Sequence, residues 1–289
     1  MNTPSTAVRV RPFYWSAQRE LWENRSLFIA PAAVAGIILF GLLISTITLP
    51  HRMPAILALS AAQQRAKIAE PYNMVAGLLL LTAFVVGMFY CGDALQSERR
   101  DRSILFWKSL PVSDLITVLA KAAIPLVALP VIIYPIIVAV QVLMAIVSSM
   151  VLSTNGLSSA PIWAQFGYGS SWIALLYGLT VVALWHAPIY AWLLLVSAWA
   201  RRTAILWAVL LPGAICIVEK GAFNSTRFAR FLGYRLIGWF QEAFVVRPDP
   251  LASLNPLKFI TTPGLWIGLV FAALCLAGAV RLRRYRGPI

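Results

Sequence analysis

The sequence is poor in acidic residues and in histidine. Of its 289 residues, 10 are Asp or Glu and 2 are His, whereas 24 are Lys or Arg. Almost no carboxylate lies in the middle of an apolar run, so the acids that an intramembrane hydrolase or a proton pump requires are missing. Walker-type Gly-x-x-x-x-Gly-Lys-Ser/Thr, Gly-x-Ser-x-Gly and His-Glu-x-x-His motifs are absent too, which argues against nucleotide binding and against these hydrolase classes. We therefore expect no catalytic residue, cofactor site or metal site in this chain.

Cysteine is also scarce, and Cys91, Cys216 and Cys275 each lie in an apolar run. No two of them form a Cys-x-x-Cys pair, so the sequence indicates neither a disulfide framework nor a zinc site. The first residues do not show the pattern of a cleavable signal peptide, and the first apolar run is long and uncut. We interpret that run as a membrane span.

Charge is scarce overall: 12% of residues are charged, 60% are hydrophobic and the mean hydropathy is +0.80. A soluble globular domain carries about 25% charged residues. Six apolar runs meet the length of roughly 20 residues that a membrane-spanning helix needs. These runs cover residues 27–49, 72–95, 116–147, 171–199, 203–220 and 263–281. The sequence therefore predicts an all-α polytopic membrane protein, with residues 1–289 forming a single transmembrane domain.

The formal net charge of +14 would suggest a nucleic-acid partner in a soluble protein. In a membrane protein, topology and lipid headgroups explain it more simply. Fifteen of the 24 Lys and Arg residues fall on the side that holds both termini. The positive-inside rule then places both termini in the cytoplasm. We expect the membrane to be a bacterial-type inner (plasma) membrane. We expect membrane lipids, and no nucleic acid, to be partners.

Residues 12–25 precede the first span and form an amphipathic pattern. At 100° per residue, one side carries Tyr14, Trp15, Ala17, Leu21 and Trp22, and the other carries Ser16, Arg19, Glu20, Glu23 and Asn24. Two tryptophans on one face are typical of a helix that lies in the membrane interface. The alternative is a solvated helix that packs on a partner.

A second unusual segment, residues 221–260, lies before the last span. Its large apolar residues recur at helical spacing, but arginines lie between them and four prolines fall at or near its end. It is too polar to span the membrane and too apolar to stay in water. We predict an outer amphipathic or re-entrant insertion of one or two short helices.

Polar and aromatic residues inside the spans are candidates for a substrate path: Phe84, Met88, Tyr134, Gln141, His186 and Glu219. An ionisable residue at mid-depth is a functional hypothesis by default. For His186 the competing interpretation is a neutral imidazole that bonds to a carbonyl freed by Pro188. Glu219 and Lys220 also fit a boundary pair at the membrane surface, and the aromatic residues and Met88 also fit simple packing.

The most informative segment is a polar island at residues 96–114. It carries both signs of charge, at Glu98, Arg99, Arg100, Asp101 and Arg102. These charges are followed by four consecutive bulky apolar residues, Ile104 to Trp107. A loop that needs only water would not carry such a block. We interpret the island as a docking surface for a soluble partner.

The island resembles a segment of the permease subunits of type-2 ATP-binding-cassette exporters. The matching residues are Glu98, Asp101, Arg102-Ser103, Leu110, Pro111-Val112-Ser113 and Lys121, with Arg102 in place of the usual glycine. The interfacial helix, the six spans, the cytoplasmic termini and the outer insertion match the layout of that family. The resemblance therefore covers nearly the full chain, although its sharpest motif spans about twenty residues.

The resemblance implies a transporter subunit, not an enzyme. A second permease copy or a paralogue would form the dimer, and separate cassette-type ATPase subunits would bind and hydrolyse ATP-Mg and drive export across the inner membrane. The residues of the coupling helix would be Glu98, Arg99, Arg100, Asp101, Arg102, Leu105, Phe106 and Trp107. The short connection at 200–202 would make a smaller contact. On this basis Glu98→Lys or Trp107→Ala would uncouple transport but leave insertion intact.

Two other classes stay open at this point. One is a self-sufficient channel or secondary carrier, for which only His186 and the proline-rich third span offer material. The other is a membrane scaffold that assists the assembly of an envelope protein or a metal site. The aromatic, largely uncharged spans favour an amphipathic or apolar cargo if the chain is an exporter.

Overall fold

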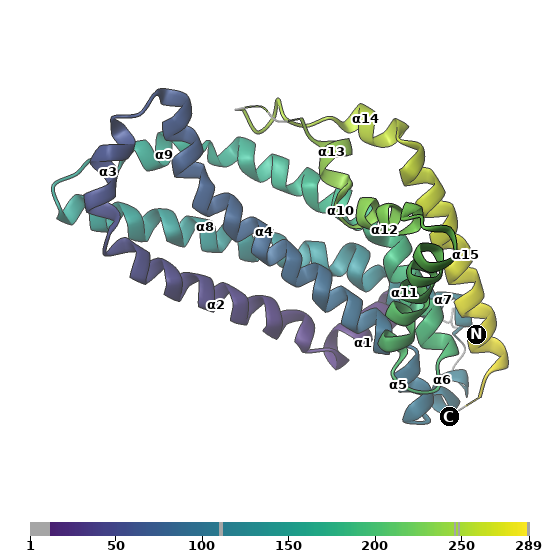
Figure 1. Ribbon diagram of the computed structural model, residues 1–289. Helices are drawn as coiled ribbons and strands as arrows, with labels where there is room; N and C mark the ends of the chain where they lie inside the picture. The colour runs from purple at the N-terminus through teal and green to yellow at the C-terminus, as the bar shows by residue number, and fades with distance from the viewer. Residues whose placement is uncertain (1–11, 110–111, 246, 248, 288–289) are drawn as a thin grey trace, which may run out of the picture.

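The computed structural model describes residues 12–109, 112–245, 247 and 249–287, and nearly all of this chain is helical (Figure 1). Its elements in chain order are α1 (Pro12–Glu23), α2 (Ser26–Thr46), α3 (Leu49–Leu57), α4 (Ala61–Asp93), α5 (Gln96–Arg100), α6 (Ser103–Ser109), α7 (Asp114–Ala123), the π-helical turn η1 (Ile124–Ala128), α8 (Leu129–Thr154), α9 (Ala160–Phe166), α10 (Tyr168–Trp199), α11 (Ala204–Phe223), α12 (Arg227–Ile237), α13 (Trp239–Ala243), α14 (Pro256–Thr261) and α15 (Pro263–Tyr285).

Six stretches of the described chain are long and apolar enough to cross a bilayer, which confirms the predicted all-α polytopic membrane fold. They are Ser26–Thr46, Ala61–Arg100, Asp114–Thr154, Tyr168–Trp199, Ala204–Phe223 and Pro263–Tyr285. In Figure 1, α3 and α9 join the spans at one end, whereas α1, α5, α6 and the C-terminal end of α15 gather at the other. We call this second end the basal end.

Helix α10 is the centre of the bundle. In its apolar stretch 67% of the residues are buried, against 11% in α11. Small residues recur every four positions along α10, at Ala183, Ala187 and Ala191, and two of them pack against Ala272 and Cys275 of α15. Such a small-residue ridge lets two helix backbones approach closely where no hydrophobic effect drives association.

The third apolar stretch changes its helical geometry near its basal end. Residues Ile124–Ala128 form a π-helical turn between α7 and α8. Pro130 has no backbone N–H to bond the carbonyl four residues earlier, and Pro125 lies inside the turn itself. A single π-helical turn is one of the ways in which a helix absorbs such a misfit.

Helix α1 turns its aromatic residues outward and one acid inward. Phe13, Tyr14, Trp15 and Trp22 are exposed, whereas Glu20 is buried. The exposed aromatic side fits the predicted interfacial helix. The polar side, however, contributes one side chain, that of Glu20, to the protein interior.

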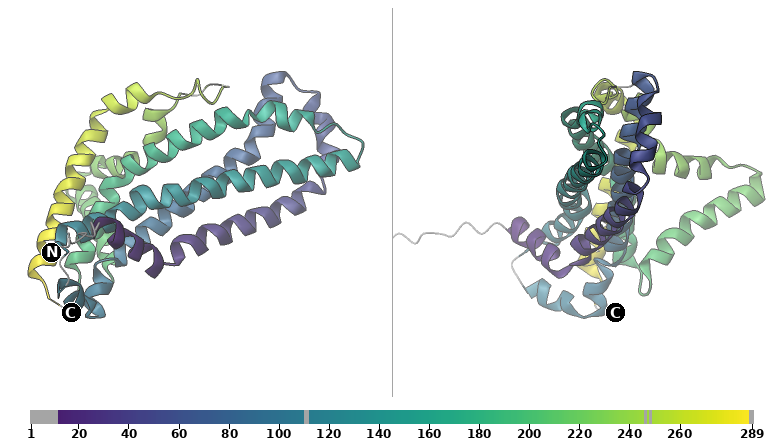
Figure 2. Two further views of the ribbon diagram at one scale, coloured as in Figure 1. Left: turned by 180° about the vertical axis from the view of Figure 1, so that it is seen from behind. Right: turned by 90° about the vertical axis from the view of Figure 1, so that its left-hand side faces the viewer.

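Residues 221–260 form the end of α11 and the short helices α12, α13 and α14. Figure 2 shows that α11 and α12 make a V that projects from the side of the body, with α12 returning to the body. The C-terminal end of α12 contacts the middle of α10. The indole of Trp185 on α10 donates a hydrogen bond to the carbonyl of Arg235 on α12 over 2.9 Å. Pro256 and Pro263 do not break helices; each is the first residue of one, where a missing N–H costs nothing.

Candidate functional site

The polar island folds as two short helices at the basal end, and the first of them is bonded to the α10–α11 turn. The hydroxyl of Ser197 accepts the backbone N–H groups of Leu95 at 3.1 Å and Gln96 at 2.9 Å. The side chain of Gln96 in turn accepts the N–H of Ala204, the first residue of α11, at 3.0 Å. All these groups are buried, so each bond satisfies a donor that would otherwise be lost at a helix start.

Arg99 strengthens the same connection. Its Nη1 donates to the carbonyls of Ala198 at 2.8 Å and Ala200 at 3.2 Å, and its Nε donates to the carbonyl of Gly287 at 3.3 Å. The carbonyls of Ala198 and Ala200 lie at and after the end of α10, and that of Gly287 follows the end of α15. A cation is favoured at such helix ends by the helix dipole. Helix α5 and the 200–203 turn therefore form one structural unit.

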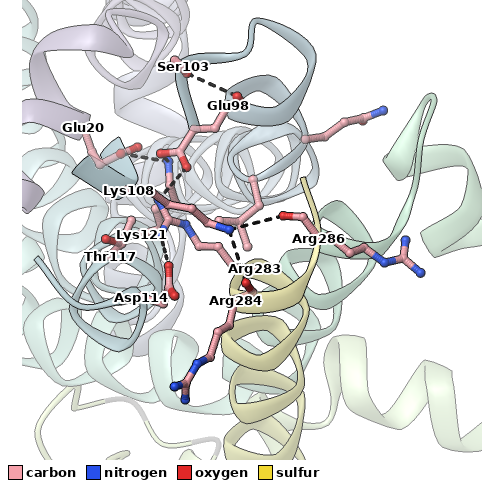
Figure 3. A network of polar contacts seen from close by, with 12 residues as sticks. Glu20, Glu98, Ser103, Lys108, Asp114, Thr117, Lys121, Arg283, Arg284 and Arg286 are labelled. Atoms are coloured by element: carbon pink, nitrogen blue, oxygen red, sulfur yellow. Dashed lines mark hydrogen bonds and ion pairs between the residues drawn. The ribbon is translucent and has the colours of Figure 1, made fainter. Parts of the chain in front are cut away.

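Glu98 lies at the centre of a buried ion-pair network (Figure 3). Its Oε1 is 3.1 Å from Nζ of Lys121 on α7 and 3.3 Å from Nη2 of Arg19 on α1. Its Oε2 accepts from Nη2 of Arg283 on α15 at 3.1 Å. Arg283 also forms an ion pair with Asp114, the first residue of α7. One carboxylate on α5 thus contacts three helices that are far apart in the sequence.

Glu20 forms the second half of the network. Its Oε1 is 2.8 Å from Nζ of Lys121 and 2.6 Å from Nη2 of Arg19, and its Oε2 accepts from the hydroxyl of Tyr90 at 2.8 Å. Burial by itself raises the pKa of this carboxyl. The attraction of Lys121, together with the hydrogen bonds from Lys121 and Arg19, outweighs burial and holds the pKa below its ordinary value.

Apart from Glu23, which lies 3.6 Å from Arg19 but is 53% exposed, the network is balanced in charge. It contains three acids and three cations, which we call together the basal network: Arg19, Glu20, Glu98, Asp114, Lys121 and Arg283. Four of these side chains, those of Glu20, Glu98, Lys121 and Arg283, are at most 7% exposed. A buried ion pair adds little net stability when it is complete, but losing one partner leaves an uncompensated charge. Such a network therefore specifies one arrangement of helices more than it stabilises the chain.

The C-terminal end of α15 is also tied to α6. Nζ of Lys108 lies 3.3 Å from the carbonyl of Arg284 and 3.5 Å from that of Arg286 (Figure 3). The guanidinium of Arg286 donates to the carbonyl of Trp199 at the end of α10. Cations close to the C-terminal ends of α10 and α15 complement the negative ends of these helices.

Helix α6 presents part of its apolar block to the outside. Ile104 is buried, whereas Leu105 is 59% and Phe106 is 60% exposed. The Trp107 ring packs edge-on against Phe106, and the guanidinium of Arg19 lies over it at 3.7 Å from the ring centroid. Leu105 and Phe106 form the outward apolar surface of α6. The helix that carries them contacts the basal network directly, through Trp107 and Arg19.

The eight residues predicted to contact an ATPase differ in their exposure to solvent. Arg100, Asp101, Arg102, Leu105 and Phe106 are exposed, and Trp107 is partly buried. Glu98 and Arg99 are buried and bond within the chain. The prediction that these two residues contact the ATPase therefore needs correction, since their charges are already neutralised by other helices or aimed at carbonyls.

Arg102 occupies the turn between α5 and α6 with φ of 58°. This left-handed conformation costs a residue with a side chain roughly 1–2 kcal/mol, and glycine adopts it freely. Since glycine also loses more freedom on folding, by roughly 0.5–1 kcal/mol, we expect Arg102→Gly to stabilise the chain by about 1 kcal/mol or less. Thermal unfolding in detergent, compared with Arg100→Gly on the adjacent helix, measures the difference; a loss of stability in Arg102→Gly would contradict it.

Two of the candidate path residues come together. The Phe84 ring lies 4.6 Å from the His186 ring, and Phe84 also lines an apolar cavity of about 20 Å³ beside Pro125 and Pro130. His186 has Nδ1 at 2.9 Å from the carbonyl of Val182 and Nε2 at 3.1 Å from that of Leu236. The imidazole thus packs against backbone carbonyls, although not against that of Leu184, which Pro188 leaves without its donor.

The other candidates lie apart from this pair and make local contacts. Gln141 is buried, donates to the carbonyl of Tyr72 at 3.1 Å and accepts from the indole of Trp172 at 3.0 Å. Tyr134 and Met88 belong to two different apolar clusters. Glu219 accepts the backbone N–H groups of Arg227 and Phe228 at 2.9 Å each, so it caps the start of α12.

Sequence reasoning missed three parts of the basal end: the inward orientation of Glu20, the pairing of Arg283, and the capping roles of Gln96 and Ser197. One signal was available. Lys121 is the only charged residue in the predicted third span, and a lysine at that depth needs an acidic partner. The partner could not be identified, because the helical pattern of residues 12–25 does not say which polar side chain turns inward.

Within the described ranges, no three His, Cys, Asp or Glu residues gather as metal ligands would. Comparisons with known proteins identify no relative. No family model matches the chain, and neither the curated proteins nor the solved structures contain a significant match.

Proposed function

We propose that this chain is the membrane-spanning subunit of an ATP-driven exporter, and that the outward surface of α6 docks on a separate ATPase subunit. The observation that supports this most directly is the combination of two exposed apolar residues, Leu105 and Phe106, with a buried network behind them. A surface that only faced water would need neither the apolar side chains nor the rigid support.

The network makes α6 suitable as a lever. Glu98 is bonded to α1, α7 and α15, and Ser103 at the start of α6 donates to the carbonyl of Glu98 at 3.4 Å. A push on Leu105 and Phe106 therefore reaches three helices through short ionic contacts and not through a flexible loop. Packed helices respond to such a displacement by rigid-body shifts.

The α10–α11 turn belongs to the same lever, because Arg99, Gln96 and Ser197 bond it to α5. Movement of α5 would then displace α10, the central helix, together with α11, the least buried one. In this proposal both termini and the ATPase lie on the cytoplasmic side, and the V of α11 and α12 lies toward the outer leaflet. A second copy or a paralogue completes the transport path.

The proposal is tested by affinity purification of the tagged chain from its own membranes in mild detergent. We expect a cassette-type ATPase to co-purify in stoichiometric amount. The double variant Leu105→Ser, Phe106→Ser should reduce that amount at least about tenfold, because apolar anchors carry most of the binding energy of an interface. Mass spectrometry of the purified material measures both results.

The matched control is Leu257→Ser, Ile260→Ser on α14, which removes two apolar side chains that are 77% and 54% exposed. It should leave the ATPase bound. Recovery of the chain without any ATPase would instead favour the carrier or scaffold classes. Full ATPase recovery with the α6 variant would contradict docking through Leu105 and Phe106.

A further inference from the structure

Arg235, near the end of α12, is a buried cation outside the basal network. It is 7% exposed, and its guanidinium lies 4.9 Å from the ring centroid of Trp185 on α10. Nη2 donates to the carbonyl of Gly264 at 2.9 Å, whereas the buried Nη1 has no hydrogen-bond partner. One end of this fork of donors is thus satisfied and the other is not.

None of the ten Asp and Glu side chains, all of which lie in the described residues, forms an ion pair with Arg235. Eight of them form ion pairs with other cations: Glu20, Glu23, Glu70, Asp93, Glu98, Asp101, Asp114 and Glu242. Of the two others, Glu219 accepts backbone N–H groups of α12, and Asp249 accepts the N–H of Leu251. A counter-anion for this guanidinium must therefore come from outside the chain.

The last span, α15, has space for the guanidinium of Arg235 where two glycines lack side chains. Gly264 and Gly268 lie one turn apart on α15, and a methyl group at Gly268 would overlap the guanidinium of Arg235. At Gly264 a methyl group would touch the ring of Tyr234 at 3.4 Å. The two glycines thus form a notch that holds Tyr234 and Arg235. In this arrangement α12 covers the notch.

A buried cation without an acid is costly, and ionisable groups at membrane depth commonly mark substrate or ion pathways. The planar guanidinium matches the oxygens of a phosphate in a bidentate geometry. The indole of Trp185 and the apolar, largely unburied α11 that leads into α12 offer surfaces for hydrocarbon. A site that combines a cation with apolar surface suits an anionic amphiphile as its ligand.

We propose that Arg235 binds the phosphate of an anionic amphiphile, which would be the cargo class of the exporter proposed above and rests on that function. In the closed arrangement the guanidinium lies in the glycine notch; when α12 lifts from α15, breaking the bond to Gly264, the guanidinium turns to the incoming phosphate.

The test uses the purified full-length chain in detergent and needs no ATPase. Binding of dioctanoyl phosphatidic acid is compared with that of dioctanoylglycerol, which has the same acyl chains but no phosphate, and with that of inorganic phosphate. We expect the phosphatidic acid to bind at least about tenfold more tightly than dioctanoylglycerol, from the usual strength of charged hydrogen bonds. Arg235→Gln should abolish the difference and Arg235→Lys should keep part of it.

Arg230→Gln is the matched control, because it removes the same charge from an exposed position of the same helix. It should leave the preference intact. An equal loss with Arg230→Gln, or no preference for the phosphate in the wild type, would overturn the proposal. If Arg235→Gln fails to fold, the binding of phosphatidic acid and dioctanoylglycerol to the wild type and to Arg235→Lys still tests the proposal.

Inorganic phosphate that binds as tightly as phosphatidic acid would support an anion site but overturn the amphiphile as its ligand. The outcome is independent of the ATPase experiment. A captured ATPase without phosphate preference overturns only the cargo assignment, and phosphate preference without an ATPase overturns only the exporter.

Discussion

Lys121→Met should cost the folded chain about 3–5 kcal/mol of stability, the range for removing one partner of a buried ion pair. The ammonium group lies between Glu20 at 2.8 Å and Glu98 at 3.1 Å, and its side chain is 3% exposed. Methionine fills similar space without the charge. The two carboxylates then face each other with only Arg19 between them, and α7 loses its ionic contacts with α1 and α5.

The stability of Lys121→Met is measured by thermal unfolding in detergent, with Lys67→Met as the matched control. Lys67 forms an ion pair with Glu70 at 3.0 Å, but both side chains are more than half exposed. Exposed pairs contribute about 0–1 kcal/mol, so the control should unfold close to the wild type. Similar shifts for both variants would show that the buried carboxylates do not depend on Lys121.

Glu98→Lys should prevent accumulation of folded protein. The substitution replaces the acid shared by Arg19, Lys121 and Arg283 with a fourth cation in a nearly dry site. Like charges at such distances, in a region of low dielectric, repel by several kcal/mol. This prediction differs from the expectation from sequence that Glu98→Lys leaves insertion intact and disturbs only coupling, because the structure places Glu98 among buried cations.

The yield of monodisperse protein after size-exclusion chromatography measures the effect of Glu98→Lys. Glu98→Gln keeps the shape and removes only the charge, so its loss of yield should be smaller. Trp107→Ala, which removes a partly buried ring beneath Arg19, should fold, and it is the better variant for a coupling assay. A normal yield of Glu98→Lys would mean that Glu98 is not buried among these cations.

Hydropathy was sufficient to predict the six spans, because each span is a contiguous run of about twenty apolar residues and is recognisable without knowing its neighbours. The boundaries were less accurate where a helix continues beyond the apolar run. Helix α4 begins at Ala61, eleven residues before the predicted span at 72, because Gln63, Gln64 and Arg65 extend the helix without adding hydropathy. The island at 96–114 was recognisable because its charges interrupt two apolar runs.

The pairing of the charges could not be predicted. Glu20 and Lys121 are 101 residues apart, and Glu98 and Arg283 are 185 apart. Local spacing reports which residues share a helix face, and it contains no information on which face another helix covers. For the same reason Glu98 and Arg99 looked like surface charges, although four helices and a turn surround them.

The position of Arg283 has a consequence for the order in which the chain is assembled. Helix α15 is synthesised after every other described helix, and until it arrives Glu98 and Asp114 lack the cation that they share. The earlier helices can insert, but their basal ends carry uncompensated acid and can rearrange. Closure of the network then coincides with the completion of the bundle, so a chain that stops before α15 leaves Asp114 without its ion-pair partner.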